Sequence, residues 1–164
     1  MKINRLIYPL FLLVVLSSCA SDEEKMTQYM SGKWKTIFLS LEMPTYQNKD
    51  TLVAYNIDFL NPDDAEAKAL GDTYTLHNAD GSFKTWQSKR GIPSRTLSKG
   101  KWRATLDSLY YTFESRDRET TVSFGLKKIE DGFSIKVLQD RDNDGVKDDT
   151  YYTETLRVPE DVKK

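Results

Sequence analysis

Short stretches in which apolar and polar residues alternate recur along most of the chain. In the segment 35–43, apolar side chains occupy every second position from Ile37 to Met43. Alternation with a period of two residues indicates a β-strand that buries one face. By this criterion we predict strands within 35–43, 53–59, 74–76, 83–87, 100–106, 109–113, 122–126, 133–137 and 150–158.

The connections between these stretches are mostly short and polar. Asn78-Ala79-Asp80-Gly81 is a turn signal, whereas 89–99, with Gly91 and Pro93, is interpreted as a longer loop. Short connections join antiparallel neighbours, and closing the sheet removes its exposed edges. We therefore predict an all-β fold, an antiparallel up-and-down barrel of about eight or nine strands, which is a size that can hold one small ligand.

One short helix is predicted to interrupt the strand series. Asn61 is a good N-cap, Pro62 suits the first helical position, and Gly71 can close the end. We expect this helix to be an insertion at the rim of the barrel. Residues 26–30, ahead of the first strand, can form one helical turn.

The N-terminal segment has the composition of a secretory signal. Lys2 and Arg5 precede the apolar run 6–16, which is shorter than the roughly 20 residues needed to span a bilayer as a helix. The sequence Leu-Ser-Ser-Cys that ends at Cys19 resembles the lipobox of bacterial lipoproteins. This resemblance implies a signal peptide over 1–18 and acylation of Cys19, with palmitate as a suitable label. The alternative is a buried N-terminal helix with an incidental cysteine.

Residues 19–25 are expected to form a lipidated acidic leash between the anchor and the folded domain. Two or more acyl chains are needed for stable anchoring in a bilayer. The acidic run Asp22-Glu23-Glu24 resembles surface-export signals of Bacteroidota lipoproteins, and Ala20 directly after the cysteine resembles outer-membrane sorting. These resemblances imply a lipid anchor in the outer membrane, on its periplasmic or cell-surface side. The alternative is a plain solvated linker.

Composition indicates one ordinary globular domain after the signal. Of the 164 residues, 38% are hydrophobic and 30% are charged, which suffices for a sizeable core. Removing Lys2 and Arg5 with the signal peptide changes the net charge from −1 to −3. Because no basic stripe is present to neutralise phosphates, we expect no nucleic-acid partner. Cys19 is the single cysteine, so a disulfide within the chain is excluded.

The motif Gly32-x-Trp34 opens the first predicted strand, directly after the expected helical turn. With the strand pattern, it resembles the lipocalin-like lipoproteins of Bacteroidota over residues 26–158, and 159–164 is then a C-terminal tail. The resemblance implies that Trp34 lies at the closed end of the barrel with Arg157 packed over its ring. Such a contact contributes about 0.5–2 kcal/mol. The alternative is that Trp34 is a core aromatic in another antiparallel barrel or sandwich.

Aromatic residues of the predicted strands are the candidates for lining the barrel. They would contact a small, largely apolar ligand, or they would simply fill the interior, as side chains do in small barrels. The candidates are Trp34, Tyr55, Phe59, Phe83, Trp102, Tyr111, Phe113, Phe124 and Phe133.

The segment 140–149 has the spacing of a calcium-binding loop. Acidic side chains at alternate positions, followed by Gly145, can direct oxygens toward one centre. The segment resembles the Asp-rich loops of dockerins and thrombospondin-type repeats, but Tyr151 stands where the last acidic ligand is expected, so Asp149, Glu154 or water would replace it. The alternative is an ordinary hairpin turn. The expected Ca²⁺ ligands are Asp140, Asp142, Asp144, the carbonyl group of Val146, and Asp148; no organic cofactor is expected.

The sequence lacks the groupings that common catalytic sites require. His77 is the single histidine, and its place beside a turn predicts an exposed side chain. A Cys–His nucleophile or a zinc site cannot be assembled, and neither a nucleophile elbow nor a phosphate-binding glycine loop is present. In the last strand, one phase would bury Glu154 and the other Tyr151 and Arg157, and contact between Trp34 and Arg157 favours the second.

These features together predict a binding protein and not an enzyme. We expect a membrane-anchored, exported lipoprotein with a lipocalin-like barrel that binds a small, largely apolar ligand. The alternative is a structural or interaction module that docks on an envelope protein in a cell-envelope complex. Such a module would have a Ca²⁺-stabilised loop and no small-molecule ligand.

Overall fold

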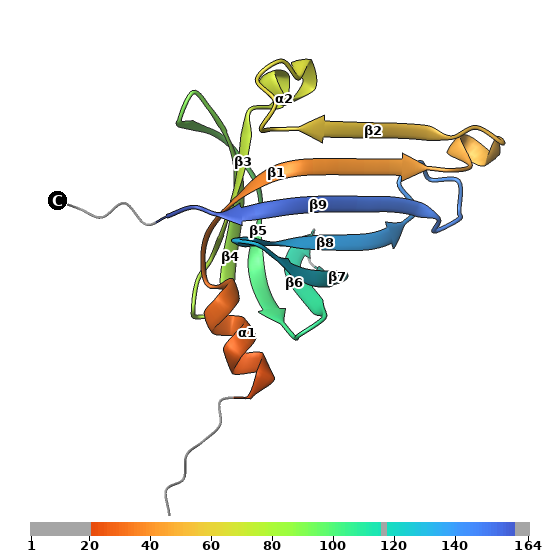
Figure 1. Ribbon diagram of the computed structural model, residues 1–164. Helices are drawn as coiled ribbons and strands as arrows, with labels where there is room; N and C mark the ends of the chain where they lie inside the picture. The colour runs from red at the N-terminus through yellow and green to blue at the C-terminus, as the bar shows by residue number, and fades with distance from the viewer. Residues whose placement is uncertain (1–20, 116–117, 160–164) are drawn as a thin grey trace, which may run out of the picture.

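The computed structural model describes residues 21–115 and 118–159 (Figure 1). The predicted signal peptide, the anchor at Cys19 and most of the predicted tail therefore lie outside the described residues. No helix in the described part of the chain is long and apolar enough to cross a membrane.

In this part of the chain, nine antiparallel strands form one sheet. Strand β1 pairs with β3 at one edge and with β9 at the other, so that eight strands close a barrel and β2 is an extra strand. The predicted all-β up-and-down barrel is confirmed. In chain order the strands are β1 (Gly32–Met43), β2 (Val53–Asp58), β3 (Asp72–His77), β4 (Ser82–Lys89), β5 (Ile92–Ala104), β6 (Ser108–Ser115), β7 (Arg118–Ile129), β8 (Gly132–Gln139) and β9 (Asp149–Arg157).

Two short seams close the barrel, and both lie near the same end. Strand β1 pairs with β3 over Gly32–Lys35, and β5 pairs with β6 over Lys101–Ala104. The second seam begins at a close approach of two chains, because a Cβ atom added at Gly100 would lie 2.1 Å from the carbonyl oxygen of Thr112. Beyond the seams the strands diverge, and the second half of β1 pairs with β2 instead of β3 (Figure 1). We call the seam end, which carries the β3–β4, β5–β6 and β7–β8 turns, the closed end, and the opposite end the open end.

Helix α1 (Asp22–Met30) lies against the closed end (Figure 1). Ser21 caps it, since the Ser21 hydroxyl accepts the Glu24 N–H and the Glu24 carboxylate accepts the Ser21 N–H. The acidic residues expected in a leash therefore form the first turn of a helix, where negative charge is favourable. Part of the segment expected to be a leash is thus helical, because Ser21 and Glu24 form a capping box.

Helix α2 (Ala65–Leu70) is shorter than predicted. Its N-cap is Asp64, whose carboxylate accepts the N–H of Ala67, whereas Asn61 accepts the N–H of Asp63 in the preceding turn. Gly71 ends the helix as predicted, at φ 74°. One 3-10 turn, η1 (Tyr46–Asn48), follows β1.

The predicted loop 89–99 is mostly strand. Arg90 and Gly91 have φ values of 53° and 78° and join β4 to β5 as a two-residue hairpin turn. Two register shifts between β4 and β5 accommodate the hairpin. Glycine, proline and serine suggested a loop, but pairing with β4 outweighs their low strand propensity.

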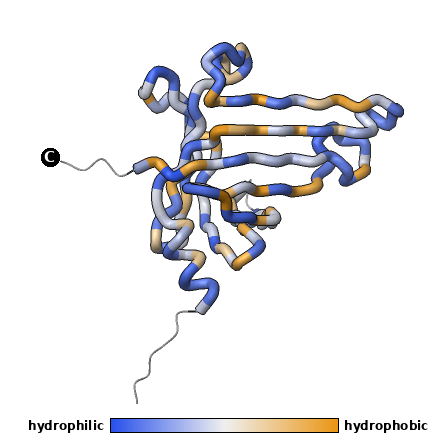
Figure 2. Tube along the Cα trace, viewed as in Figure 1, coloured by the Kyte–Doolittle hydropathy of each residue, from blue (hydrophilic) through white to orange (hydrophobic). Residues whose placement is uncertain are grey.

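The core lies at the closed end. Met26 and Met30 of α1 are fully buried against Trp34, Trp102 and Leu109 of the barrel. Figure 2 shows the alternation of apolar and polar positions along the strands that produces this inward apolar face.

Candidate functional site

Trp34 and Arg157 meet at the closed end. The Arg157 Cζ atom lies 4.1 Å from the Trp34 ring centroid, as the family resemblance implies. The Arg157 guanidinium also donates hydrogen bonds to the carbonyl groups of Ser31, at 2.9 Å, and Tyr29. The Trp34 indole N–H donates to the carbonyl of Met30 at 2.7 Å. These bonds fasten the end of α1 to the first and last strands.

Strand β9 adopts the second of the two phases considered for it. Asp149, Thr153 and Thr155 are buried, and Tyr151 shares their inward face. Glu154 is on the opposite face, where it accepts a 2.6 Å hydrogen bond from the Tyr152 hydroxyl. The Glu154 carboxylate is therefore not inside the barrel and needs no partner there.

His77 is buried, and the prediction of an exposed side chain was wrong. Its relative exposure is 1%, because α1 covers the end of β3. The Nδ1 atom lies 3.1 Å from the carbonyl oxygen of Met30, and Nε2 lies 2.7 Å from the Tyr111 hydroxyl. Since a carbonyl only accepts, Nδ1–H is the donor and Nε2 accepts the Tyr111 proton.

Burial governs the ionisation of this buried pair. Removal from water disfavours the charged imidazolium and lowers the pKa of His77 to about 4. Burial likewise raises the pKa of the Tyr111 hydroxyl. Both groups are therefore neutral near pH 7, and both nitrogens of the ring have partners, as expected for a structural histidine.

The predicted lining residues fall into three groups. Trp34, Phe83, Trp102 and Phe133 are buried in the core. Tyr111, Phe113 and Phe124 are partly buried against it. The third group, Tyr55 and Phe59, does not belong to the closed barrel.

Tyr55 and Phe59 belong to the extra strand and its end, which do not take part in closing the barrel. Both are in or directly after β2, which pairs with the outer half of β1 and is not a barrel strand. The Tyr55 side chain is 46% exposed. Their alternation matched that of barrel strands, and alternation alone does not reveal where a strand pairs.

The barrel interior is filled unequally. At the closed end the inward side chains pack against one another, and the rings of Trp34 and Phe133 lie 4.9 Å apart between centroids. Toward the open end, pairing places Leu39 and Leu41 on the face of Thr153 and Tyr151. Of the inward apolar side chains there, Leu39, Leu41, Val122 and Val137 are only partly buried, whereas Met43 and Ile57 on the same face of β1 and β2 are buried.

The acidic loop between β8 and β9 brings together two of the predicted carboxylates, Asp140 and Asp142, with Asp149, which was considered as a replacement for the last ligand. One carboxylate oxygen from each of Asp140, Asp142 and Asp149 lies within 4.8 Å of the others. Asp149 is buried at the start of β9 and accepts the N–H groups of Arg141 and Asp142. These three oxygens are suitable donors for a hard cation such as Ca²⁺.

The other two predicted carboxylate ligands face the β1–β2 connection. Thr45 donates its hydroxyl to Asp148 at 2.9 Å, and the Asn48 N–H donates to Asp144 at 3.3 Å. Asp142 also accepts the N–H of Gln47. The Val146 N–H donates to Asp144, so this part of the loop forms an ordinary Asx-type turn. Hydrogen bonds thus satisfy several carboxylate oxygens of this loop without an ion.

One site was missed at the sequence level. Lys33, Tyr74 and Trp86 border a groove of about 650 Å³ on the outer surface of β3, β4 and β5. Tyr74 and Trp86 point to the opposite face of the sheet from buried His77 and Phe83. Aromatic residues in outward-facing positions are the signal that would have indicated it.

Neither a scan of protein-family models nor a search of curated proteins finds a match to this chain.

Proposed function

We propose that this chain is an exported lipoprotein, anchored through acylated Cys19 in the outer membrane, whose lipocalin-like barrel binds a small, largely apolar ligand. The observation that carries the binding proposal is the unequal filling of the barrel. The anchor proposal rests on the sequence up to Cys19.

The open half of the barrel offers apolar surface to a ligand. Leu39, Leu41 and Val137 point inward yet remain partly accessible. Covering such surface contributes about 25 cal/mol per Å². The Thr153 and Tyr151 hydroxyls add a few polar groups to this face, as is typical of sites that orient a mostly apolar molecule.

A binding role also agrees with how the candidate catalytic groups are used. Both nitrogens of His77 are bonded inside the core, and Glu154 bonds to Tyr152 on the outer face. A general acid or base must reach a substrate proton, and these arrangements do not favour that. We therefore propose a binding protein and not an enzyme.

The ligand is tested by purifying the full chain from its own membrane and measuring co-purified small molecules by mass spectrometry after denaturation. Leu41→Gln, which places an amide in the open half, should reduce the amount retained per protein at least fivefold. Leu138→Gln is the matched control, because Leu138 is on the outer face and is 57% exposed. Equal retention by both variants, or no retained molecule, would contradict the binding proposal.

The anchor is tested by labelling cells with palmitate. The wild-type chain should incorporate label and sediment with membranes, whereas Cys19→Ala should do neither. An unlabelled wild-type chain that keeps its first eighteen residues would show that the lipobox resemblance is misleading.

A second candidate function is an interaction module of a cell-envelope complex. The acidic loop favours it, because the loop and the β1–β2 connection form one hydrogen-bonded surface at the open end. In this case Ca²⁺ bound by Asp140, Asp142 and Asp149 would stabilise the surface.

Millimolar Ca²⁺ should then raise the melting temperature and EDTA should lower it, and Asp140→Asn should remove both effects. Asp50→Asn, an exposed position in the neighbouring connection, is the charge-matched control. A melting temperature that is insensitive to Ca²⁺ and EDTA would exclude the ion.

A further inference from the structure

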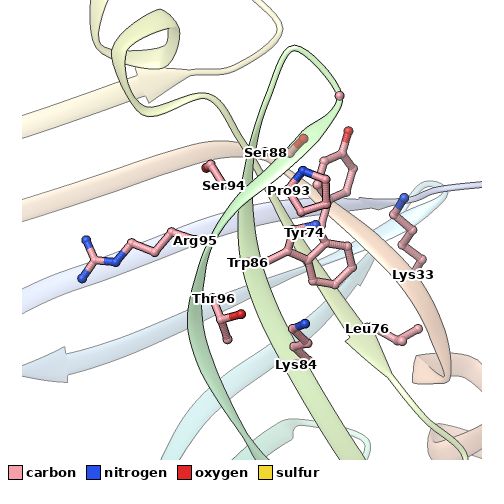
Figure 3. A pocket seen from close by; sticks show the side chains of 11 residues that line it. Lys33, Tyr74, Leu76, Lys84, Trp86, Ser88, Pro93, Ser94, Arg95 and Thr96 are labelled. Atoms are coloured by element: carbon pink, nitrogen blue, oxygen red, sulfur yellow. The ribbon is translucent and has the colours of Figure 1, made fainter.

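The groove on the outer surface of the barrel is separate from the interior. Its floor is formed by side chains of β3 and β4, and its far wall by the β5 arm of the β4–β5 hairpin (Figure 3). Its volume of about 650 Å³ is in the range of small-molecule sites. Since Tyr74 and Trp86 point away from the interior, a molecule in this groove would not compete with one inside the barrel.

Two aromatic rings form the floor. Tyr74 and Trp86 are directly opposite each other on β3 and β4, with ring centroids 5.7 Å apart and planes inclined by 24°. Cross-strand aromatic pairs stabilise a sheet. Both side chains here are only partly buried, so ring surface remains available to a ligand.

Two lysines add positive charge beside the rings. The Lys33 Nζ atom lies 4.5 Å from the Tyr74 centroid and 5.8 Å from the Trp86 centroid. Lys84 borders the same floor, whereas the Arg95 side chain points away from the Trp86 ring (Figure 3). Nearby, Lys35 is paired with Asp72 at 2.8 Å.

The two groove lysines differ from Lys35. Among the described residues, neither Lys33 nor Lys84 forms an ion pair with a carboxylate. Each ammonium group carries three donors, so both can bind oxygens of an anionic ligand. A purely apolar ligand would displace water from these ammonium groups and would offer them no hydrogen-bond acceptors in its place.

We propose that this groove binds an acidic saccharide. The C–H face of a pyranose ring packs mainly on the Trp86 ring, because the Lys33 ammonium lies over the Tyr74 ring, and the sugar carboxylate accepts charge-assisted hydrogen bonds from Lys33 and Lys84. The hydroxyl of Thr96 on the hairpin wall is a partner for sugar hydroxyls. Single-stranded nucleic acids also use aromatic and basic residues, but they need a basic groove that follows a run of phosphates, and here the positive charge at the rings is confined to Lys33 and Lys84.

The probe is trigalacturonic acid, with uncharged maltotriose as its comparison. Both are titrated by calorimetry into the full chain in detergent micelles. Trigalacturonic acid should bind saturably and at least tenfold more tightly than maltotriose, and added salt should weaken it. Absence of binding, equal binding of both sugars, or tighter binding of a thymidine oligonucleotide would overturn the proposal.

Variants then locate the site. Lys33→Met should weaken binding at least fivefold, and Trp86→Leu should abolish it, whereas Trp86→Phe keeps an aromatic face and should bind within threefold of the wild type. Lys128→Met is the matched control, because the Lys128 ammonium lies 4.1 Å from the Tyr29 ring centroid at the closed end.

Near-ultraviolet circular dichroism verifies that each variant is folded. If Trp86→Leu does not fold, Lys33→Met and Trp86→Phe decide the question. Wild-type affinity in Lys33→Met would overturn the proposal.

Discussion

The closed and open ends of the barrel are built from the same strands but differ in packing and in hydrogen bonding. At the closed end, α1 fills the opening, and buried Trp34 and His77 together with exposed Arg157 donate hydrogen bonds to carbonyls near the end of this helix. At the open end, carboxylates of an exposed loop accept hydrogen bonds from Thr45 and its neighbours. The comparison teaches that closure by two short seams concentrates stability at one end and leaves inward apolar surface accessible at the other.

The largest expected effect is a loss of packing at the closed end. Trp34→Ala should lower the free energy of unfolding by about 3–5 kcal/mol, because it leaves a cavity beside Phe133 and removes the surface under Arg157. Tyr55→Ala, at a 46% exposed position on β2, should change it by about 0.5 kcal/mol or less. Urea unfolding followed by far-ultraviolet circular dichroism measures both values. Similar losses in the two variants would contradict the proposed division between the ends.

An intermediate effect concerns acid stability. The folded chain holds His77 with a pKa of about 4, below the value of 6.5 for a solvated histidine. Between these values the unfolded state binds more protons, so stability is constant above about pH 6.5 and falls as the pH decreases toward 4. The loss amounts to about 3 kcal/mol at most.

The free energy of unfolding measured from pH 7.5 to 4 tests this. His77→Gln keeps an amide donor and acceptor but does not titrate, so its profile should be flatter in that window. Hydrogen bonds lower the carboxyl pKa values of Asp64, Asp80 and Asp107. Protonation of these carboxylates therefore reduces the free energy of unfolding at lower pH than the titration of His77 does. A profile of equal slope in His77→Gln would assign the acid sensitivity to other groups.

The smallest expected effect is at the open end. Thr45→Val removes the donor to Asp148 and should cost about 1 kcal/mol, with faster hydrogen exchange at the amides of Gln47 and Arg141. Thr105→Val is the matched control, since Thr105 donates to Asp107 within the β5–β6 turn at the closed end. Protection of Gln47 and Arg141 should be unchanged there. Unchanged exchange in Thr45→Val would show that the loop and the β1–β2 connection are not coupled.

Features that depend on local pattern could be predicted from the sequence. Alternation within each segment indicated the strands, whereas the contact between Trp34 and Arg157 was expected only from the lipocalin-like resemblance. Features that depend on distant partners could not be predicted this way. His77 is buried because α1, far away in sequence, covers it, and Tyr55 lies outside the barrel because β1 exchanges one partner for another along its length.

The acidic loop shows the same limit at the level of single side chains. Spacing predicted that the Asp148 carboxylate would join those of Asp140 and Asp142. Strand β9 begins at Asp149, however, and the Asp149 carboxylate points inward and joins them instead. Asp148 bonds instead to Thr45, on a connection more than ninety residues earlier. Spacing within a loop defines which oxygens are available, and the adjoining strand determines which of them converge.

The attachment of Arg157 to the last turn of α1 has a mechanical consequence. A pull on the chain ahead of Ser21 would load α1 and the Arg157 bonds to the Tyr29 and Ser31 carbonyls together with β1. Strand β1 is flanked by β9 along most of its length, so the load would be shared in shear across many backbone hydrogen bonds. If the proposed anchor at Cys19 is present, traction on it would thus be borne by the closed end, with little distortion transmitted to the open end.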